Sequence, residues 1–186
     1  MKKVIISIFA FCAVLAAVAA PNTNEAIGIR LVKEAYAKAQ ERAASEYTAK
    51  FNTKLSQIAP GVGLQDKNID VFYTLDMDEN GYSIQPYLVR CKYNIAARNC
   101  YEEYLYDEHG NRQFYYERSD SYKEDNAVEE TRIYFNAEGD IFYSEVKTIV
   151  DGKVVKTEEF DSNSDYIMYI INRFESYKLI TQKLAV

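Results

Sequence analysis

The stretch Tyr101–Tyr116, YEEYLYDEHGNRQFYY, decides the fold class of this chain. Two tyrosine-rich runs flank Asp107–Gly110, which has the Asp-x-x-Gly form of a type I turn closed by a left-handed glycine. Tyrosine has a high strand propensity, so the stretch predicts two antiparallel strands joined by a tight turn. Similar turn signals recur along the chain, at Asp78–Gly81, at Asn136–Gly139 and, in a shorter form, at Asp151-Gly152.

Helices are predicted before and after this strand region. The turn signals divide residues 69–160 into about seven antiparallel strands. Residues 22–53 carry apolar side chains every four residues, and Asn22 with Glu25 forms the pattern of a capping box. Residues 164–184 carry a broad apolar stripe at helical spacing. We therefore predict an α+β fold, a curved antiparallel meander with both helices packed on its apolar face.

The N-terminal segment has the pattern of an export signal. Lys2 and Lys3 precede the apolar run Val4–Leu15, and small alanines follow it. We predict cleavage before Ala20, which gives a signal peptide (1–19) and a single domain (20–186) in the periplasm or secreted. A retained anchor is the alternative, but the apolar stretch is short for a bilayer span and ends mostly in alanine. We therefore expect no integral membrane span after cleavage.

The charge of the chain argues against some partners. It has 22 Lys and Arg residues against 28 Asp and Glu residues, a net charge of −6. Binding to nucleic acid or to an anionic membrane surface needs a basic surface that neutralises phosphates. We therefore expect neither of these partners, and a ligand or an envelope component is expected instead.

Two cysteines remain after the predicted cleavage, Cys91 and Cys100. Cysteines in an oxidising compartment commonly pair. The midpoint between them falls between Ile95 and Ala96, so a symmetric hairpin turning there would place them opposite each other. The sequence thus predicts a disulfide between Cys91 and Cys100.

Few residues suit catalysis. His109 is the only histidine and lies in a predicted turn, so a histidine-based triad or a multi-histidine zinc site is excluded. Paired carboxylates can hydrolyse glycosides when they converge across a cleft. Adjacent residues on a strand point to opposite faces, so convergence would need carboxylates from different strands. The adjacent acidic pairs are Glu102-Glu103, Glu129-Glu130 and Glu158-Glu159.

A partial calcium motif begins at Asp76. Asp76, Asp78 and Asn80 match the first half of a calcium-binding loop. The position that should supply a bidentate glutamate is Tyr87, and the hairpin turn accounts for Asp78 without a metal. We predict no cofactor, with calcium at Asp76, Asp78 and Asn80 as the alternative.

The chain has 17 tyrosines and no tryptophan. Strand propensity explains a tyrosine-rich sheet, but neighbouring tyrosines on a strand must face opposite sides. Some should therefore lie outside the core, where aromatic rings stack on sugars or anchor a partner. The candidate binding aromatics are Tyr101, Tyr115 and Tyr122.

The order of these features resembles a known group of proteins. An export signal, a long helix, the loop with Pro60, Gly61 and Gly63, and the strand stretch Glu102–Asn111 together resemble small exported proteins of Bacteroidetes bacteria. The group has no assigned activity. The resemblance therefore implies export and a helix-plus-sheet architecture, and it implies no catalytic residues.

These observations favour an exported, non-enzymatic binding protein whose ligand is a small apolar molecule, a glycan or a protein partner. A carboxylate-based hydrolase is one alternative, and a structural or assembly component of the cell envelope is another. Two converging carboxylates in a cleft would favour the hydrolase. A large apolar cavity under Phe174 and Ile170 would favour an apolar ligand.

Overall fold

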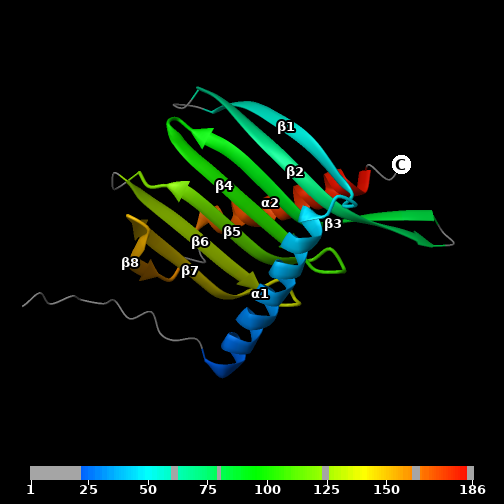
Figure 1. Cartoon of the computed structure of the whole chain (residues 1–186), viewed down its shortest axis with the longest axis horizontal. Helices are drawn as coiled ribbons and strands as arrows, with labels where there is room; N and C mark the ends of the chain where they lie inside the picture. The colour runs from blue at the N-terminus through cyan, green and yellow to red at the C-terminus, as the bar shows by residue number, and fades with distance from the viewer. Residues whose placement is uncertain (1–21, 60–62, 79–80, 123–125, 161–163, 184–186) are drawn as a thin grey trace, which may run out of the picture.

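The structure is a computed structural model that describes residues 22–59, 63–78, 81–122, 126–160 and 164–183. The predicted signal peptide lies outside the described residues. One antiparallel sheet of eight strands forms the centre of the fold, and its strand order follows the chain order. Helix α1 crosses one face of this sheet, and helix α2 lies behind the other face (Figure 1).

The elements follow one another without a crossover. Neither described helix is long and apolar enough to cross a membrane. The bounds are α1 (Thr23–Ala44), β1 (Lys50–Ala59), β2 (Gly63–Asp78), β3 (Gly81–Ile95), β4 (Arg98–Tyr106), β5 (Arg112–Asp120), β6 (Ala127–Phe135), β7 (Ile141–Val150), β8 (Lys153–Glu158) and α2 (Asp165–Gln182).

The predicted glycine turns between β4 and β5 and between β6 and β7 are confirmed. Gly110 and Gly139 both have positive φ values, +74° and +85°, which glycine adopts without steric cost. The Asp107 carboxylate accepts hydrogen bonds from the backbone N–H groups of His109 and Asn111, so it fixes the first turn. These local interactions explain why the turn pattern located the hairpins.

The predicted length of the first helix was wrong. The capping box of Asn22 and Glu25 is present, but α1 ends at Ala44 and not at residue 53. Strand β1 follows and pairs along its whole length with β2, which gives eight strands where about seven were predicted. Tyr47, which continued the apolar spacing of the helix, is 95% exposed. Pairing with β2 thus overrides the helical pattern of the segment that β1 occupies.

The predicted position of both helices on one face was also wrong, because the sheet is buried on both faces at its centre. Tyr104 and Leu105 are neighbours on β4 and point to opposite sides, yet both are buried. Tyr104 packs against Phe174 of α2, with ring centroids 5.0 Å apart. Leu105 belongs to the cluster that contains Ile29 and Val32 of α1. The fold therefore has three layers, with one helix over each face.

The register of the β3–β4 hairpin differs from the predicted one. Cys91 lies opposite Glu102, and Cys100 lies opposite Tyr93. The hairpin closes with Ile95 opposite Arg98, so every partner shifts by two residues from the symmetric turn that we expected. Both cysteines are buried free thiols, and the structure does not contain the predicted disulfide between them.

Candidate functional site

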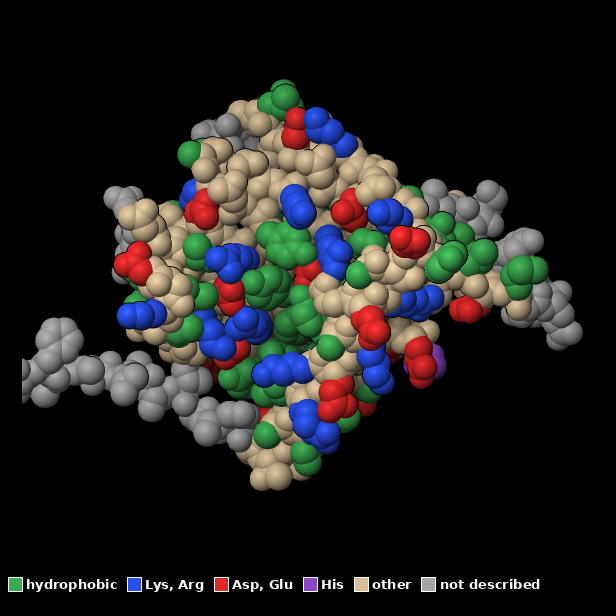
Figure 2. Space-filling model, viewed as in Figure 1, with side chains coloured by type: hydrophobic (Ala, Val, Ile, Leu, Met, Phe, Trp, Pro, Cys, Tyr) green, Lys and Arg blue, Asp and Glu red, His purple; other side chains and the backbone are tan. Residues whose placement is uncertain are grey.

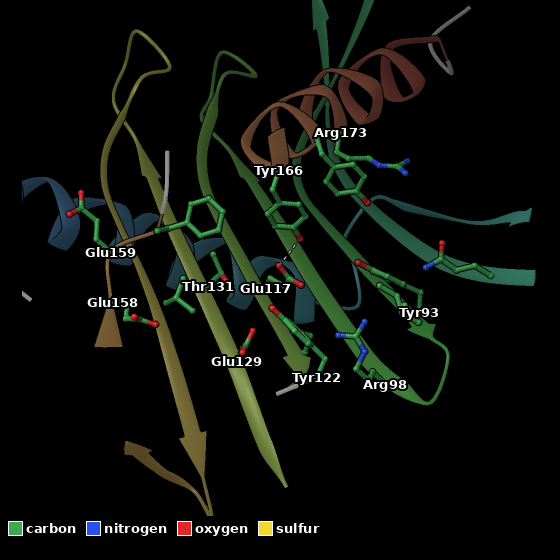
Figure 3. Close-up of a pocket in the computed structure, with 16 residues that line it drawn as sticks. Tyr93, Arg98, Glu117, Tyr122, Glu129, Thr131, Glu158, Glu159, Tyr166 and Arg173 are labelled. Atoms are coloured by element: carbon green, nitrogen blue, oxygen red, sulfur yellow. Dashed lines mark hydrogen bonds between the residues drawn. The ribbon is translucent and has the colours of Figure 1, made fainter. Parts of the chain in front are cut away.

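A pocket of about 850 Å³ lies on the α2 face of the sheet, beside the N-terminal half of α2. Side chains from β3, β5, β6 and β7 form its floor, and α2 supplies one wall (Figure 3). The pocket exists because α2 starts at Asp165 and leaves one end of this face uncovered. A cavity under Phe174 and Ile170 would have favoured an apolar ligand, but among the described residues both side chains are buried in the core cluster that α2 forms with the sheet.

Aromatic rings line much of this pocket. Tyr166 and Tyr169 lie one turn apart on α2, and their rings stack with centroids 5.5 Å apart and an interplanar angle of 10°. Phe160 contacts the Tyr166 ring at 6.1 Å, and Tyr93 approaches from β3. Such a set offers flat apolar faces and hydroxyl groups in one place, which suits a ligand with both apolar and polar parts.

Glu117 lies on the pocket floor, on strand β5. Its Oε2 accepts hydrogen bonds from the hydroxyls of Tyr166, at 2.7 Å, and Tyr115, at 3.2 Å. Burial raises the pKa of Glu117 above its usual range, and the two hydroxyl donors reduce this increase. Figure 3 shows the Glu117 side chain directed toward Tyr166 and the pocket interior.

A buried ion pair lies next to Glu117. Lys67 Nζ is 2.9 Å from Glu102 Oε2, and both side chains are almost completely buried. The hydroxyls of Tyr93 and Tyr104 also donate to Glu102, at 2.5 and 2.9 Å. Lys67 lies over the Tyr93 ring at 3.9 Å from its centroid. Because every charge in this group is matched, we assign it a structural role under the pocket wall.

The other face of the sheet shows the same pairing of charges. Figure 2 views this face, where acidic and basic side chains lie intermixed beside α1. Glu103 has Arg90 at 2.9 Å. Glu130 has Arg132 at 2.6 Å, and Glu145 has Lys147 at 2.8 Å. These ion pairs account for the charged side chains buried next to α1.

Glu117 differs from these glutamates. In the part of the chain that the structure describes, no Lys or Arg lies within ion-pair distance of its carboxylate. Its Oε1 accepts no hydrogen bond from the described residues. Glu117 is therefore a largely buried carboxylate that faces the pocket, and no described Lys or Arg forms an ion pair with it.

Glu129 is a second carboxylate on the pocket floor. Glu117 lies opposite Thr131 on β6, so Glu129 occupies the next position along the same face of that strand. The Ser121 hydroxyl donates to Glu129 at 3.3 Å. Glu130, its neighbour in sequence, points to the α1 face. Two carboxylates from neighbouring strands thus face one pocket. The members of the adjacent pairs Glu102-Glu103 and Glu129-Glu130 point to opposite faces as expected, whereas Glu158 and Glu159 both line the pocket.

The predicted binding aromatics do not form one surface. Tyr122 lines the pocket and is 69% exposed. Tyr115 is completely buried and contributes only its hydroxyl, next to Glu117. Tyr101 lies on the opposite face, where it donates to Glu103. The prediction placed neighbouring strands correctly but could not assign faces, and it missed Glu117, Tyr166 and Tyr93.

The partial calcium motif is only partly described. Asp76 is exposed on β2 opposite Ser83, and Asp78 pairs with Gly81 in the sheet. Asn80 lies outside the described residues. Among the residues that are described, no group of three or more His, Cys, Asp or Glu side chains is placed to hold a metal ion.

Two arginines border the pocket. The Arg98 guanidinium lies 5.6 Å from the centroid of the Tyr122 ring, and that of Arg173 lies 5.0 Å from the Tyr169 ring. Both side chains therefore extend the aromatic walls and contact rings, and neither neutralises Glu117.

Comparisons with known proteins do not add to this description: no protein-family model, curated protein or solved structure matches the chain. The function must therefore be argued from the pocket itself.

Proposed function

We propose that the mature chain is an exported, non-enzymatic binding protein whose small ligand occupies the pocket beside α2. One observation carries this proposal. The Glu117 carboxylate is fixed by two tyrosine hydroxyls, lacks a cationic partner among the described residues and faces a pocket of about 850 Å³. A carboxylate that lacks a cationic partner does not stabilise the fold. A ligand that donates to its free oxygen, however, would gain binding free energy from it.

The pocket lining favours a polar ligand over an apolar one. Carboxylates on the floor would hydrogen-bond to hydroxyl or amino groups, while the rings of Tyr166 and Tyr169 would stack on the ligand's flat or hydrocarbon part. An apolar ligand would leave these carboxylates desolvated without a partner, which costs free energy. A glycan or an amine-bearing molecule fits this combination.

A carboxylate-based hydrolase is the second candidate. Glu117 and Glu129 face one pocket from neighbouring strands, and burial raises the pKa of Glu117, as a general acid requires. A glycosidase pair needs one protonated and one ionised carboxylate on either side of the scissile bond. We rank this function second because both carboxylates lie on one side of the pocket, on the sheet.

Ligand recovery tests the binding function. The mature protein would be purified from its native envelope, and the released small molecules would be identified by mass spectrometry. We expect a polar molecule that co-purifies with the protein and is lost in Glu117→Gln. Glu138→Gln is the matched control, because Glu138 lies exposed in the β6–β7 turn. Recovery of the same molecules from both variants would contradict the proposal.

The hydrolase would be detected on the same material. Release of a reducing sugar from a glycan panel by the unmodified protein, lost in both Glu117→Gln and Glu129→Gln, would favour catalysis over binding. Export is tested separately. We expect the intact mass of secreted protein to correspond to a chain that starts at Ala20, and a mass that includes residues 1–19 would contradict cleavage.

A further inference from the structure

The charges around the pocket point to the class of ligand. Four glutamates and two arginines line it. Glu158 has Lys156 at 2.7 Å, and the two arginines lie over tyrosine rings near the border. Glu117, Glu129 and the exposed Glu159 have no ion-pair partner in the described part of the chain. The pocket floor therefore carries unbalanced negative charge.

The hydrogen bonds on Glu117 define where a ligand group would bind. Both tyrosine hydroxyls donate to Oε2, and Oε1 accepts no hydrogen bond from the described residues, so its acceptor positions can serve the ligand. An ammonium group has three donors and no acceptor, so it can donate to Oε1 and to Glu129 in the same place. The Tyr166 ring is fixed by its own hydrogen bond to Glu117 and by its stacking on Tyr169, so the site is preorganised.

The charges and rings of the pocket favour a cationic ligand over a neutral one. A neutral sugar would hydrogen-bond to the carboxylates without offsetting their charge. A cation offsets the cost of holding Glu117 ionised in a largely buried position, and hydrogen bonds between charged groups are the stronger ones. Tyrosine faces add cation–π attraction, as Lys67 already shows over Tyr93 in the adjoining ion pair.

We propose that the ligand of this pocket is an organic cation whose ammonium group binds between Glu117 and Glu129 and whose hydrocarbon part packs on Tyr166. This inference rests on the proposed binding function and narrows its ligand class. It assigns Glu117 and Glu129 as the charge-recognising residues and Tyr166 as a residue that orients Glu117.

Calorimetric titration of the mature protein tests this assignment. The probes are 1,5-diaminopentane, its neutral counterpart 1,5-pentanediol, and N-acetylglucosamine. We expect the diamine to bind at least about 10-fold more tightly than the diol, because a charge-assisted hydrogen bond replaces a neutral one. Glu117→Gln should weaken diamine binding by roughly 10- to 100-fold, and Glu138→Gln should leave it unchanged. Tyr166→Phe keeps the ring and should weaken binding less than Glu117→Gln does.

The other outcomes separate this inference from the proposed function. Tight binding of N-acetylglucosamine with no preference for the diamine would overturn the cation assignment and leave the binding function intact. Diamine binding that is insensitive to Glu117→Gln would also overturn the assignment. Failure of every probe, together with failure to recover any co-purifying molecule, would overturn both. A circular dichroism spectrum of each variant confirms that it is folded.

Discussion

Glu102 and Glu117 lie directly opposite each other on β4 and β5, on the face that α2 covers. Like charges in this position repel. The two carboxylates are stabilised differently. Glu102 forms an ion pair with Lys67 at 2.9 Å, while Glu117 accepts hydrogen bonds from two tyrosine hydroxyls. Glu102 is thus paired with a cation inside the fold, whereas Glu117 faces the pocket without one among the described residues.

Removal of Lys67 should be strongly destabilising. Lys67→Met leaves the Glu102 carboxylate buried without a cation, so we expect the free energy of unfolding to fall by about 3–5 kcal/mol. The double variant Lys67→Met with Glu102→Gln should recover a large part of this loss, because it removes both charges. Urea denaturation measures both, and Lys153→Met at the exposed start of β8 is the control. Equal stability of the three variants would mean that the ion pair is not buried in solution.

Glu117→Gln should increase stability at pH 7, in contrast to Lys67→Met. Burial raises the pKa of Glu117, so the folded state binds a proton more tightly than the unfolded chain does. Stability from this group is present below the unfolded pKa and is lost as the pH rises through the folded pKa. The variant should therefore melt at a higher temperature than the unmodified protein at pH 7, with no gain at pH 3. The groups that act on Glu117 are Tyr115, Tyr166, Glu102 and Lys67, with Glu129 nearby on the same face.

A lower melting temperature for Glu117→Gln at pH 7 would contradict this expectation and would assign Glu117 a structural role. Glu117→Gln should thus weaken ligand binding and increase stability, and such a trade-off is typical of functional sites.

Helix α2 should be required for the stability of the fold. Phe174 is 1% exposed and its ring contacts those of Tyr104, Tyr106 and Phe135 at 5.0–5.6 Å. Phe174→Ala should therefore lower the free energy of unfolding by about 3–5 kcal/mol. Met168 lies on the same helix and is 56% exposed, so Met168→Ala should cost far less. Thermal denaturation of both variants measures the difference, and equal melting temperatures would show that α2 is not part of the core.

The two cysteines should be free and slow to react. Burial raises the pKa of the Cys91 thiol to about 12 and that of Cys100 to about 11, so little thiolate forms at neutral pH. We expect Ellman's reagent to find two thiols per chain starting at Ala20 after denaturation without reductant, and slow reaction before denaturation. An absence of thiols in the denatured, unreduced protein would contradict this expectation and support the disulfide and the symmetric hairpin register predicted from the sequence.

The features that depend on nearby residues could be predicted from the sequence. The turns at Gly110 and Gly139, the capping box at Asn22 and the extent of α2 all follow from interactions within a few positions. The end of α1 could not be predicted, because the segment after Ala44 keeps an apolar spacing of four and becomes a strand only by pairing with β2.

The pocket depends on contacts between distant residues. Glu117 is one glutamate among many in the sequence, and its partner Tyr166 lies on a helix that follows three further strands. Alternation along a strand indicates which residues share a face, but here both faces are buried at the sheet centre, so it does not indicate which face is the core. The tyrosine-rich composition did indicate that aromatic rings would cluster, as those of Tyr166 and Tyr169 do.

The chain-order sheet has a consequence for how the molecule folds. Each strand pairs with the next one, so every pairing closes only a short loop and loses little chain entropy. Helix α1, in contrast, contacts β3, β5 and β7. It can bury its apolar side only after those strands have joined, although it precedes all of them in the chain. The N-terminal helix is thus made early and docks late, and until then its capping box is the main interaction that holds its first turn.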